Sequence, residues 1–193
     1  MNRKAKPFVL LLVLVLSLGL MAGCSTQKTT ETPSTTPSAS SDETSAAKIN
    51  VAVYGAAGAL TDEDLTVEKM LIYAIQDEFL AHGEYEYILQ TFGDQNPFNN
   101  IIKAEEQHIA ELKILFGKYK VNVPEDKSRE HLILPANIKG ALETGVQAEI
   151  DNIAMYKKFL EQDLPADVKS TFALLLKGSE NHLAAFQNNL NKY

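Results

Sequence analysis

The stretch DEFLAHGEYEYIL (residues 77–89) and the stretch AEEQHIAEL (residues 104–112) decide the fold. In both, apolar residues recur every three or four positions, which is the period of an amphipathic α-helix. Each also carries an acidic residue on its apolar face, Glu78 in the first and Glu105 in the second. His108 follows three positions after Glu105 and therefore shares its face. Because buried ionisable groups are costly unless they are neutralised, these residues indicate a common site inside the fold.

The same period continues outward and predicts four long helices. Thr61 is the expected cap of the first helix, and Gly93 is its expected stop. Asn96 is the expected cap of the second helix, with Pro97 at the first helical position. The expected helices span residues of about 63–92, 97–119, 137–162 and 166–190.

Four amphipathic helices of this length predict an all-α, four-helix bundle over residues 61–193. The long connection, residues 121–135, joins the second and third helices. Fifteen extended residues reach roughly 45 Å, so this connection is expected to cross the length of the bundle. Residues 48–60 alternate briefly like a strand and then become Gly/Ala-rich, with no evident partner strand, and we leave them as an unassigned arm.

Polar residues also interrupt the apolar faces of the third and fourth helices. Glu149 lies between Val146 and Ile153, and His182 lies in line with Leu175 and Phe186. Each of the four helices thus directs at least one carboxylate or imidazole toward the core. A divalent or trivalent cation would neutralise them, and a hydrogen-bonded polar layer is the alternative. The candidate metal ligands are Glu78, Glu105, His108, Glu149 and His182.

The spacing of these residues repeats within the chain. The pair Glu78 and Tyr85 has the same spacing as the pair Glu149 and Tyr156. Likewise, Glu105-x-x-His108 is echoed by a segment that has Ser179 and His182 in place of Glu and His. The echo predicts two similar helical hairpins, the arrangement of di-iron carboxylate bundles, in which two helices supply a Glu and two supply Glu-x-x-His.

These motifs, together with KGSENHLAAF (residues 177–186), resemble the ferritin-like superfamily of rubrerythrin and bacterioferritin. The chain is most similar to an uncharacterised prokaryotic ferritin-like family, a domain of unknown function. The resemblance implies iron, or manganese, held by the five candidate ligands, with Tyr85 and Tyr156 beside them. Ser179 stands where the pattern has a sixth ligand, Glu. His82, one turn after Glu78, is a further candidate for a position near the site.

Three functions remain open at this point, one of which is a metal-delivery or metal-sensing protein without turnover. The resemblance implies a metal-binding protein with an oxidase- or peroxidase-type reaction, that is, a non-haem di-iron oxidoreductase. The alternative is a metal-free interaction or scaffold module, which the Ser at position 179 favours. The sequence identifies neither a substrate nor a protein partner.

The N-terminal residues predict export and a lipid anchor. Residues 1–23 combine three basic residues with an apolar run of about 15 residues, shorter than the roughly 20 of a transmembrane helix. The following LMAGC, ending at Cys24, resembles the lipobox of bacterial lipoproteins. Residues 24–47 are rich in Ser and Thr and predict a flexible tether. We therefore expect an extracytoplasmic protein attached to membrane lipid through Cys24.

The charge of the expected mature chain argues against nucleic acid as a partner. Without residues 1–23 the chain keeps 15 Lys and Arg against 25 Asp and Glu. Binding of phosphate backbones requires a basic surface, which this composition does not provide. Since Cys24 is the single cysteine, no disulfide can form within the chain.

Overall fold

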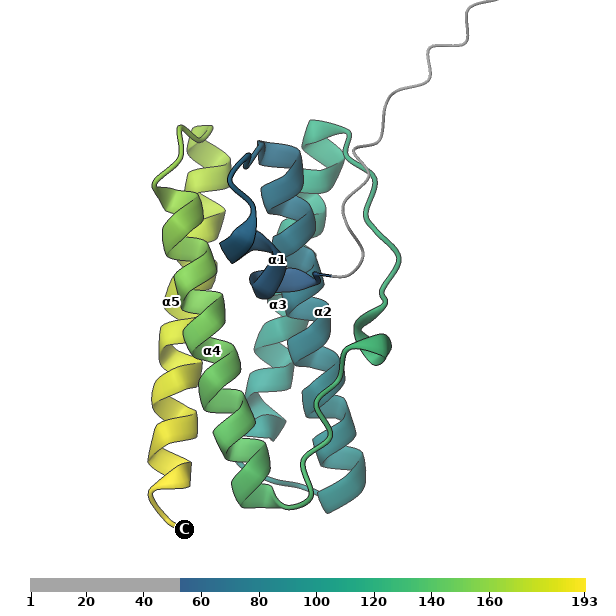
Figure 1. The fold of residues 1–193 in the computed structure, drawn as a ribbon, viewed down its shortest axis with the longest axis vertical. Coiled ribbons are helices and arrows are strands. Elements are labelled where there is room, and N and C mark those ends of the chain that lie inside the picture. The colour runs from purple at the N-terminus through teal and green to yellow at the C-terminus, as the bar shows by residue number, and fades with distance from the viewer. Residues whose placement is uncertain (1–52) are drawn as a thin grey trace, which may run out of the picture. The chain divides into compact units, whose positions relative to one another are not determined.

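The structure, a computed structural model, describes residues 53–193. Within that range the chain is helical and has no strand, so the all-α class is confirmed. The expected signal, Cys24 and the tether lie outside the described residues. None of the helices within residues 53–193 is both long and apolar enough to cross a membrane. The elements are α1 (Gly55–Thr61), α2 (Val67–Phe92), α3 (Phe98–Tyr119), the 3-10 turn η1 (Ser128–Glu130), α4 (Ile138–Leu160) and α5 (Ala166–Leu190), shown in Figure 1.

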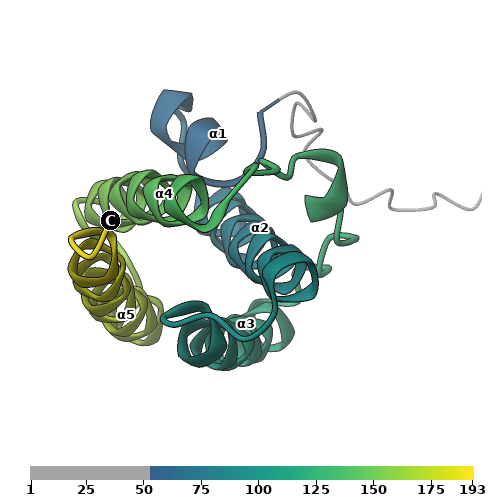
Figure 2. The same cartoon turned by 90° about the horizontal axis from the view of Figure 1, so that it is seen from below.

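The four long helices form a bundle with the predicted crossover. Helices α2 and α3, and helices α4 and α5, are joined by short connections and pack as two hairpins. Seen along the helix axes, the four helices surround a common interior (Figure 2). The connection between α3 and α4 runs along the outside of the bundle from one end to the other (Figure 1).

The helix starts differ from the predictions in two places. Thr66, and not Thr61, caps α2, since its hydroxyl accepts a hydrogen bond of 3.2 Å from the backbone N–H of Lys69. At α3, Pro97 occupies the cap position and no side chain caps the helix, so the predicted role of Asn96 is wrong. Gly93 does end α2, with a φ of 76° that suits glycine.

The apolar core is divided into two clusters along the bundle. One lies where α3 ends and α5 begins, and the other lies where α2 ends and α3 begins. Along α3, α4 and α5 the predicted ligand positions fall between these clusters, and on α2 Glu78 lies at the edge of the first cluster, beside Phe79, so together they form a polar layer across the bundle. Leu71, Leu112 and Phe172 belong to the first cluster, and Ile88, Phe98 and Phe186 belong to the second.

Part of the expected arm, residues 48–60, is helical: α1 begins at Gly55. This helix lies across α2 and α4 on the outside of the bundle (Figures 1 and 2). The backbone N–H of Ala56, at its start, donates a 2.7 Å hydrogen bond to Oδ1 of Asp77 on α2. Gly55 has a φ of 59°, and a Cβ there would lie 2.5 Å from the same oxygen, so this contact requires glycine.

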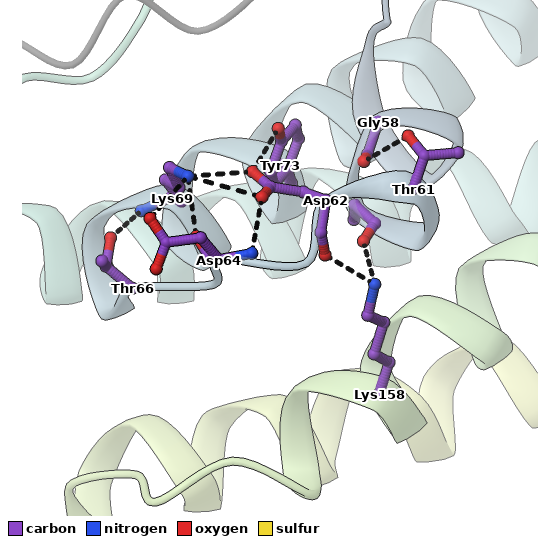
Figure 3. Close-up of polar contacts among 9 residues, drawn as sticks. Gly58, Thr61, Asp62, Asp64, Thr66, Lys69, Tyr73 and Lys158 are labelled. Carbon is purple, nitrogen blue, oxygen red and sulfur yellow. Dashed lines mark hydrogen bonds and ion pairs between the residues drawn. The ribbon is translucent and has the colours of Figure 1, made fainter.

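The other end of α1 is held by α4. Lys158 donates a 2.9 Å hydrogen bond to the backbone carbonyl of Ala59. It also donates a 2.7 Å bond to the backbone carbonyl of Asp62, which Figure 3 shows. A lysine at a helix C-terminus satisfies carbonyls that have no partner within the helix. Lys69 and Tyr73 of α2 bind the Asp62 side chain, so the end of α1 is fixed to both neighbouring helices (Figure 3).

Candidate metal centre

The fold brings all five predicted ligands together. Each is at most 8% exposed, and together they come from four different helices. Helix α2 extends beyond the start of α3 (Figure 1), which brings Glu78 level with His108 although they lie at different distances from the connection. The five residues form two groups within the polar layer.

The first group consists of Glu78, Glu105 and His108. Nδ1 of His108 lies 2.9 Å from Oε2 of Glu105 and 3.1 Å from Oε2 of Glu78. One ligand atom from each residue lies within 4.8 Å of the other two, so one cation can contact all three.

The second group consists of Glu105, Glu149 and His182. Nδ1 of His182 lies 3.1 Å from Oε1 of Glu105 and 3.4 Å from Oε1 of Glu149. Although it is close to both carboxylates, this nitrogen is buried without a hydrogen bond. A buried ring nitrogen that faces two carboxylates and has no hydrogen bond fits a cation held between them. Glu105 belongs to both groups and contributes one oxygen to each histidine.

Two buried tyrosines hold the outer carboxylates. The hydroxyl of Tyr156 donates a 2.6 Å hydrogen bond to Oε1 of Glu78, and that of Tyr85 donates a 3.0 Å bond to Oε1 of Glu149. Each tyrosine reaches across from the opposite hairpin, so the two contacts follow the repeat seen in the sequence. Such contacts restrict the orientation of a metal ligand.

Ser179 belongs to neither group. Its hydroxyl lies 2.6 Å from Oδ1 of Asn152, and Nδ2 of Asn152 donates a 2.6 Å bond to Oδ2 of Asp77. Since Asp77 also accepts the N–H of Ala56, a chain of hydrogen bonds links Ser179 to α1. Asn152 is not among the residues predicted near the site, although its position three residues after Glu149 puts it on the same helix face.

His82, predicted near the site, lies outside both groups. Its Nε2 lies 3.6 Å from Oε1 of Glu106, and both side chains are partly exposed on the flank of the bundle. Glu84, by contrast, is buried and accepts a 3.0 Å hydrogen bond from the N–H of Ile133 in the crossover. No sequence signal indicated this contact, because its partner lies 49 residues away.

The pKa values of the five groups show how the cluster is balanced without a metal. Burial, together with repulsion by Glu105, raises the pKa of Glu78 to about 8, and burial raises that of Glu149 to about 7. At Glu105, the nearby imidazoles of His108 and His182 outweigh burial and lower the pKa to about 2. Burial alone would lower the histidine pKa values, but the carboxylates raise that of His108 to about 10 and that of His182 to about 9. The raised pKa values of Glu78, Glu149 and the two histidines favour bound protons in this buried cluster.

A glycine on α5 makes room for one ligand. A Cβ at Gly178 would lie 2.6 Å from both Nε2 and Cε1 of His108. That separation is far below a normal van der Waals contact. The absence of a side chain at position 178 thus allows the imidazole to lie between α3 and α5 with Nδ1 directed at the carboxylates.

These features define an all-α bundle protein with a buried carboxylate–histidine cluster that could hold metal. The chain belongs to the DUF2202 family, described as an uncharacterized protein domain, which matches residues 67–193. It is 29% identical over 140 residues to the uncharacterized protein MJ0754 of Methanocaldococcus jannaschii, covering 64% of this chain and 74% of that protein.

The fold is also found in a solved structure. The crystal structure of the hypothetical protein MJ0754 superimposes with a TM-score of 0.60 at 24% sequence identity, over 68% of this chain and 85% of that chain. At this level of identity the likeness supports the fold alone.

Proposed function

We propose that the protein is a ferritin-like metal protein that binds iron, or manganese, between its four long helices. The observation that carries the proposal is Glu105, a buried carboxylate shared by two groups that each add one Glu and one His. Carboxylate oxygens and imidazole nitrogens without thiolates favour iron or manganese.

The residues of the chain would position such ions and control their protonation. Tyr156 and Tyr85 would orient Glu78 and Glu149, and the low pKa of Glu105 keeps its carboxylate ionised. Iron or manganese bound there would supply redox chemistry with dioxygen or peroxide, the basis for a non-haem di-iron type of oxidase or peroxidase. Glu78 and Glu149, with raised pKa values, would release protons on binding.

A second candidate function is a metal-free interaction module. Ser179 supports this candidate, because the residue at this position donates a hydrogen bond to Asn152 and does not supply a sixth metal ligand. The two candidates differ in metal content.

The test is the metal content of the full chain, purified in mild detergent without a metal-chelating tag and measured by elemental mass spectrometry. About two ions per chain would support both positions, and one would support a single position. A metal content of zero ions per chain after reconstitution with ferrous or manganous salt would contradict the metal proposal and favour the interaction module.

Three variants make the measurement specific. Glu105→Gln should remove metal from both positions, because both groups use this carboxylate. Glu149→Gln should affect the second position only. Glu106→Gln is the matched control, since Glu106 is exposed and adjacent in sequence but outside both groups.

We further propose that Cys24 carries lipid and holds the protein at the extracytoplasmic side of the cell membrane. The support is the signal-like segment of residues 1–23 and the lipobox-like LMAGC before the tether. Labelling cells with a palmitate analogue should mark the protein and place it in the membrane fraction. Cys24→Ser should remove the label, and retained label in this variant would contradict the proposal.

A further inference from the structure

A cavity of about 480 Å³ lies beside the candidate metal centre. Its walls come from α1, α2, α4 and the crossover, and its inner end reaches Glu105, Glu149 and Tyr85. Glu78 and His108 do not line it. The cavity therefore meets the second group of the cluster and not the first.

The volume suits a small organic molecule. Small-molecule sites in proteins span roughly 300–1,000 Å³, and a metal ion alone needs far less space. Leu80, Ala81, Ile133 and Ala148 contribute apolar surface. An occupant with a short hydrocarbon chain would remove this surface from water.

The charges around the cavity are of one sign. Carboxylates from α2, α3 and α4 line it, and no Lys, Arg or His is among the lining residues. At the mouth, the exposed Glu143 pairs with Lys139. The deeper Asp77 accepts only neutral donors, from Ala56 and Asn152.

Glu84 is a buried carboxylate of the cavity that forms no ion pair among the described residues. It is 3% exposed and lines the cavity, and its Oε1 accepts one hydrogen bond, from Ile133. Within residues 53–193, its Oε2 has no hydrogen-bond partner and the side chain has no ion pair. Burial raises the pKa of Glu84 to about 7. A buried carboxylate is stabilised when a cation approaches it, and no described residue supplies one.

We propose that this cavity binds a small primary amine, with its ammonium group at Glu84 and its hydrocarbon chain between Leu80 and Ile133. The site is distinct from the metal positions and does not require a metal. Its inner end adjoins Glu149, so an amine that fills the cavity would lie next to the second metal position.

The experiment is isothermal titration calorimetry of the full chain in mild detergent, with butan-1-amine and its neutral counterpart butan-1-ol. A pH of about 8 keeps Glu84 ionised, and an alkylammonium, with a pKa of about 10, stays protonated. We expect the amine to bind about tenfold more tightly than the alcohol, because a charge-assisted hydrogen bond is roughly twice as strong as the neutral bond that the alcohol can make. Equal affinity for the two probes, or no binding of either, would overturn the proposal.

Two variants test the named contacts. Glu84→Gln removes the charge and keeps the acceptor for Ile133, and it should weaken amine binding about tenfold. Ala148→Phe fills the cavity and should abolish binding. Glu86→Gln is the control, because Glu86 lies on the same helix, outside the cavity, and pairs with Arg129. Unchanged affinity in Glu84→Gln would overturn the proposal.

The same variants separate this inference from the metal proposal. Glu84→Gln should retain the metal content of the unmodified chain, since Glu84 belongs to neither ligand group. Titration of chelator-treated protein should still detect the amine. Binding that is present only with metal would contradict a site built around Glu84 and would identify the cavity as a route to the metal.

Discussion

The hydroxyl of Ser179 on α5 donates to Oδ1 of Asn152 on α4 across 2.6 Å. By the internal repeat, Ser179 is the counterpart of Glu105, yet it connects to Asp77 and through it to α1. The position that would complete a six-ligand set therefore takes part in a hydrogen-bond chain between helices.

Replacing this hydroxyl should reduce stability without removing metal. Ser179→Ala leaves the amide oxygen of Asn152 buried without its partner, and we expect a loss of about 1–3 kcal/mol in the free energy of unfolding. Urea unfolding measures this loss, with the exposed Ser170→Ala on the same helix as control. Loss of bound metal in Ser179→Ala would mean instead that the hydroxyl acts in the centre.

Adding a methyl group at Gly178 should displace His108. The new Cβ would meet the imidazole at 2.6 Å, and the ring can move only by losing its contacts with Glu78 and Glu105. We expect metal affinity to fall roughly 10- to 100-fold, the range known for changes that misorient a ligand. Competition with a metal chelator measures the affinity.

Gly117→Ala is the matched control for Gly178→Ala. Gly117 also lies in a helix, and a Cβ there meets no atom within 4 Å. This change should leave metal affinity unchanged and raise stability by roughly 0.5–1 kcal/mol. Equal metal affinity in the two variants would contradict the role assigned to Gly178.

Without metal, stability should fall as the pH rises from about 5 to about 9. Folded Glu84 and Glu149, each with a pKa raised to about 7, bind protons that the unfolded chain releases near its ordinary carboxyl pKa. The raised pKa values of His108 and His182 act in the same direction, since their stabilisation is lost as the pH rises toward about 9 to 10. Urea unfolding of chelator-treated protein across this range tests the prediction.

Glu105 affects the pH dependence of stability in the opposite direction. Its lowered pKa gives stability that is present above the ordinary carboxyl pKa and is lost as the pH falls toward about 2. With added metal, stability should rise with pH at neutral and alkaline pH instead of falling. The reason is that protons compete with the metal for the same carboxylate oxygens and imidazole nitrogens. A pH-independent stability of the metal-free protein would contradict the protonated cluster.

Lys158 should determine how firmly α1 is held. Lys158→Met removes the donor to the carbonyls of Ala59 and Asp62 while retaining a long apolar side chain. We expect faster amide hydrogen exchange in residues 55–61, with the four long helices unchanged. The exposed neighbour Lys157, changed to Met, is the control. Equal protection of α1 in both variants would show that Lys158 does not hold it.

The sequence predicted the bundle because apolar periodicity persists over more than twenty residues in each long helix. The same periodicity placed Glu78, Glu105 and Glu149 in the core, since a polar residue on an apolar face stands out in the pattern. Their grouping in the structure agrees with that expectation, and their role as metal ligands stays a prediction.

Other features depend on contacts that no local pattern encodes. Helix α1 has seven residues, too few for a clear period, and its start requires Gly55 at a positive φ beside Asp77. Thr61 and Thr66 both precede an apolar run, and only the backbone geometry selects Thr66 as the cap. The burial of Glu84 depends on the crossover, whose path along the bundle is set by tertiary packing.

The sharing of Glu105 has a thermodynamic consequence. Because its two oxygens face different histidines, an ion at either position changes the charge available to the other. Binding at the two proposed positions would therefore be linked, and by reciprocity each ion would alter the affinity for the other by the same factor. When the metal-free chain is titrated with metal ion, the binding curve should deviate from the sum of two independent hyperbolas. Glu149→Gln, which removes the second position, should give a single hyperbola. The shared Glu105 side chain would thus make metal binding at the centre cooperative.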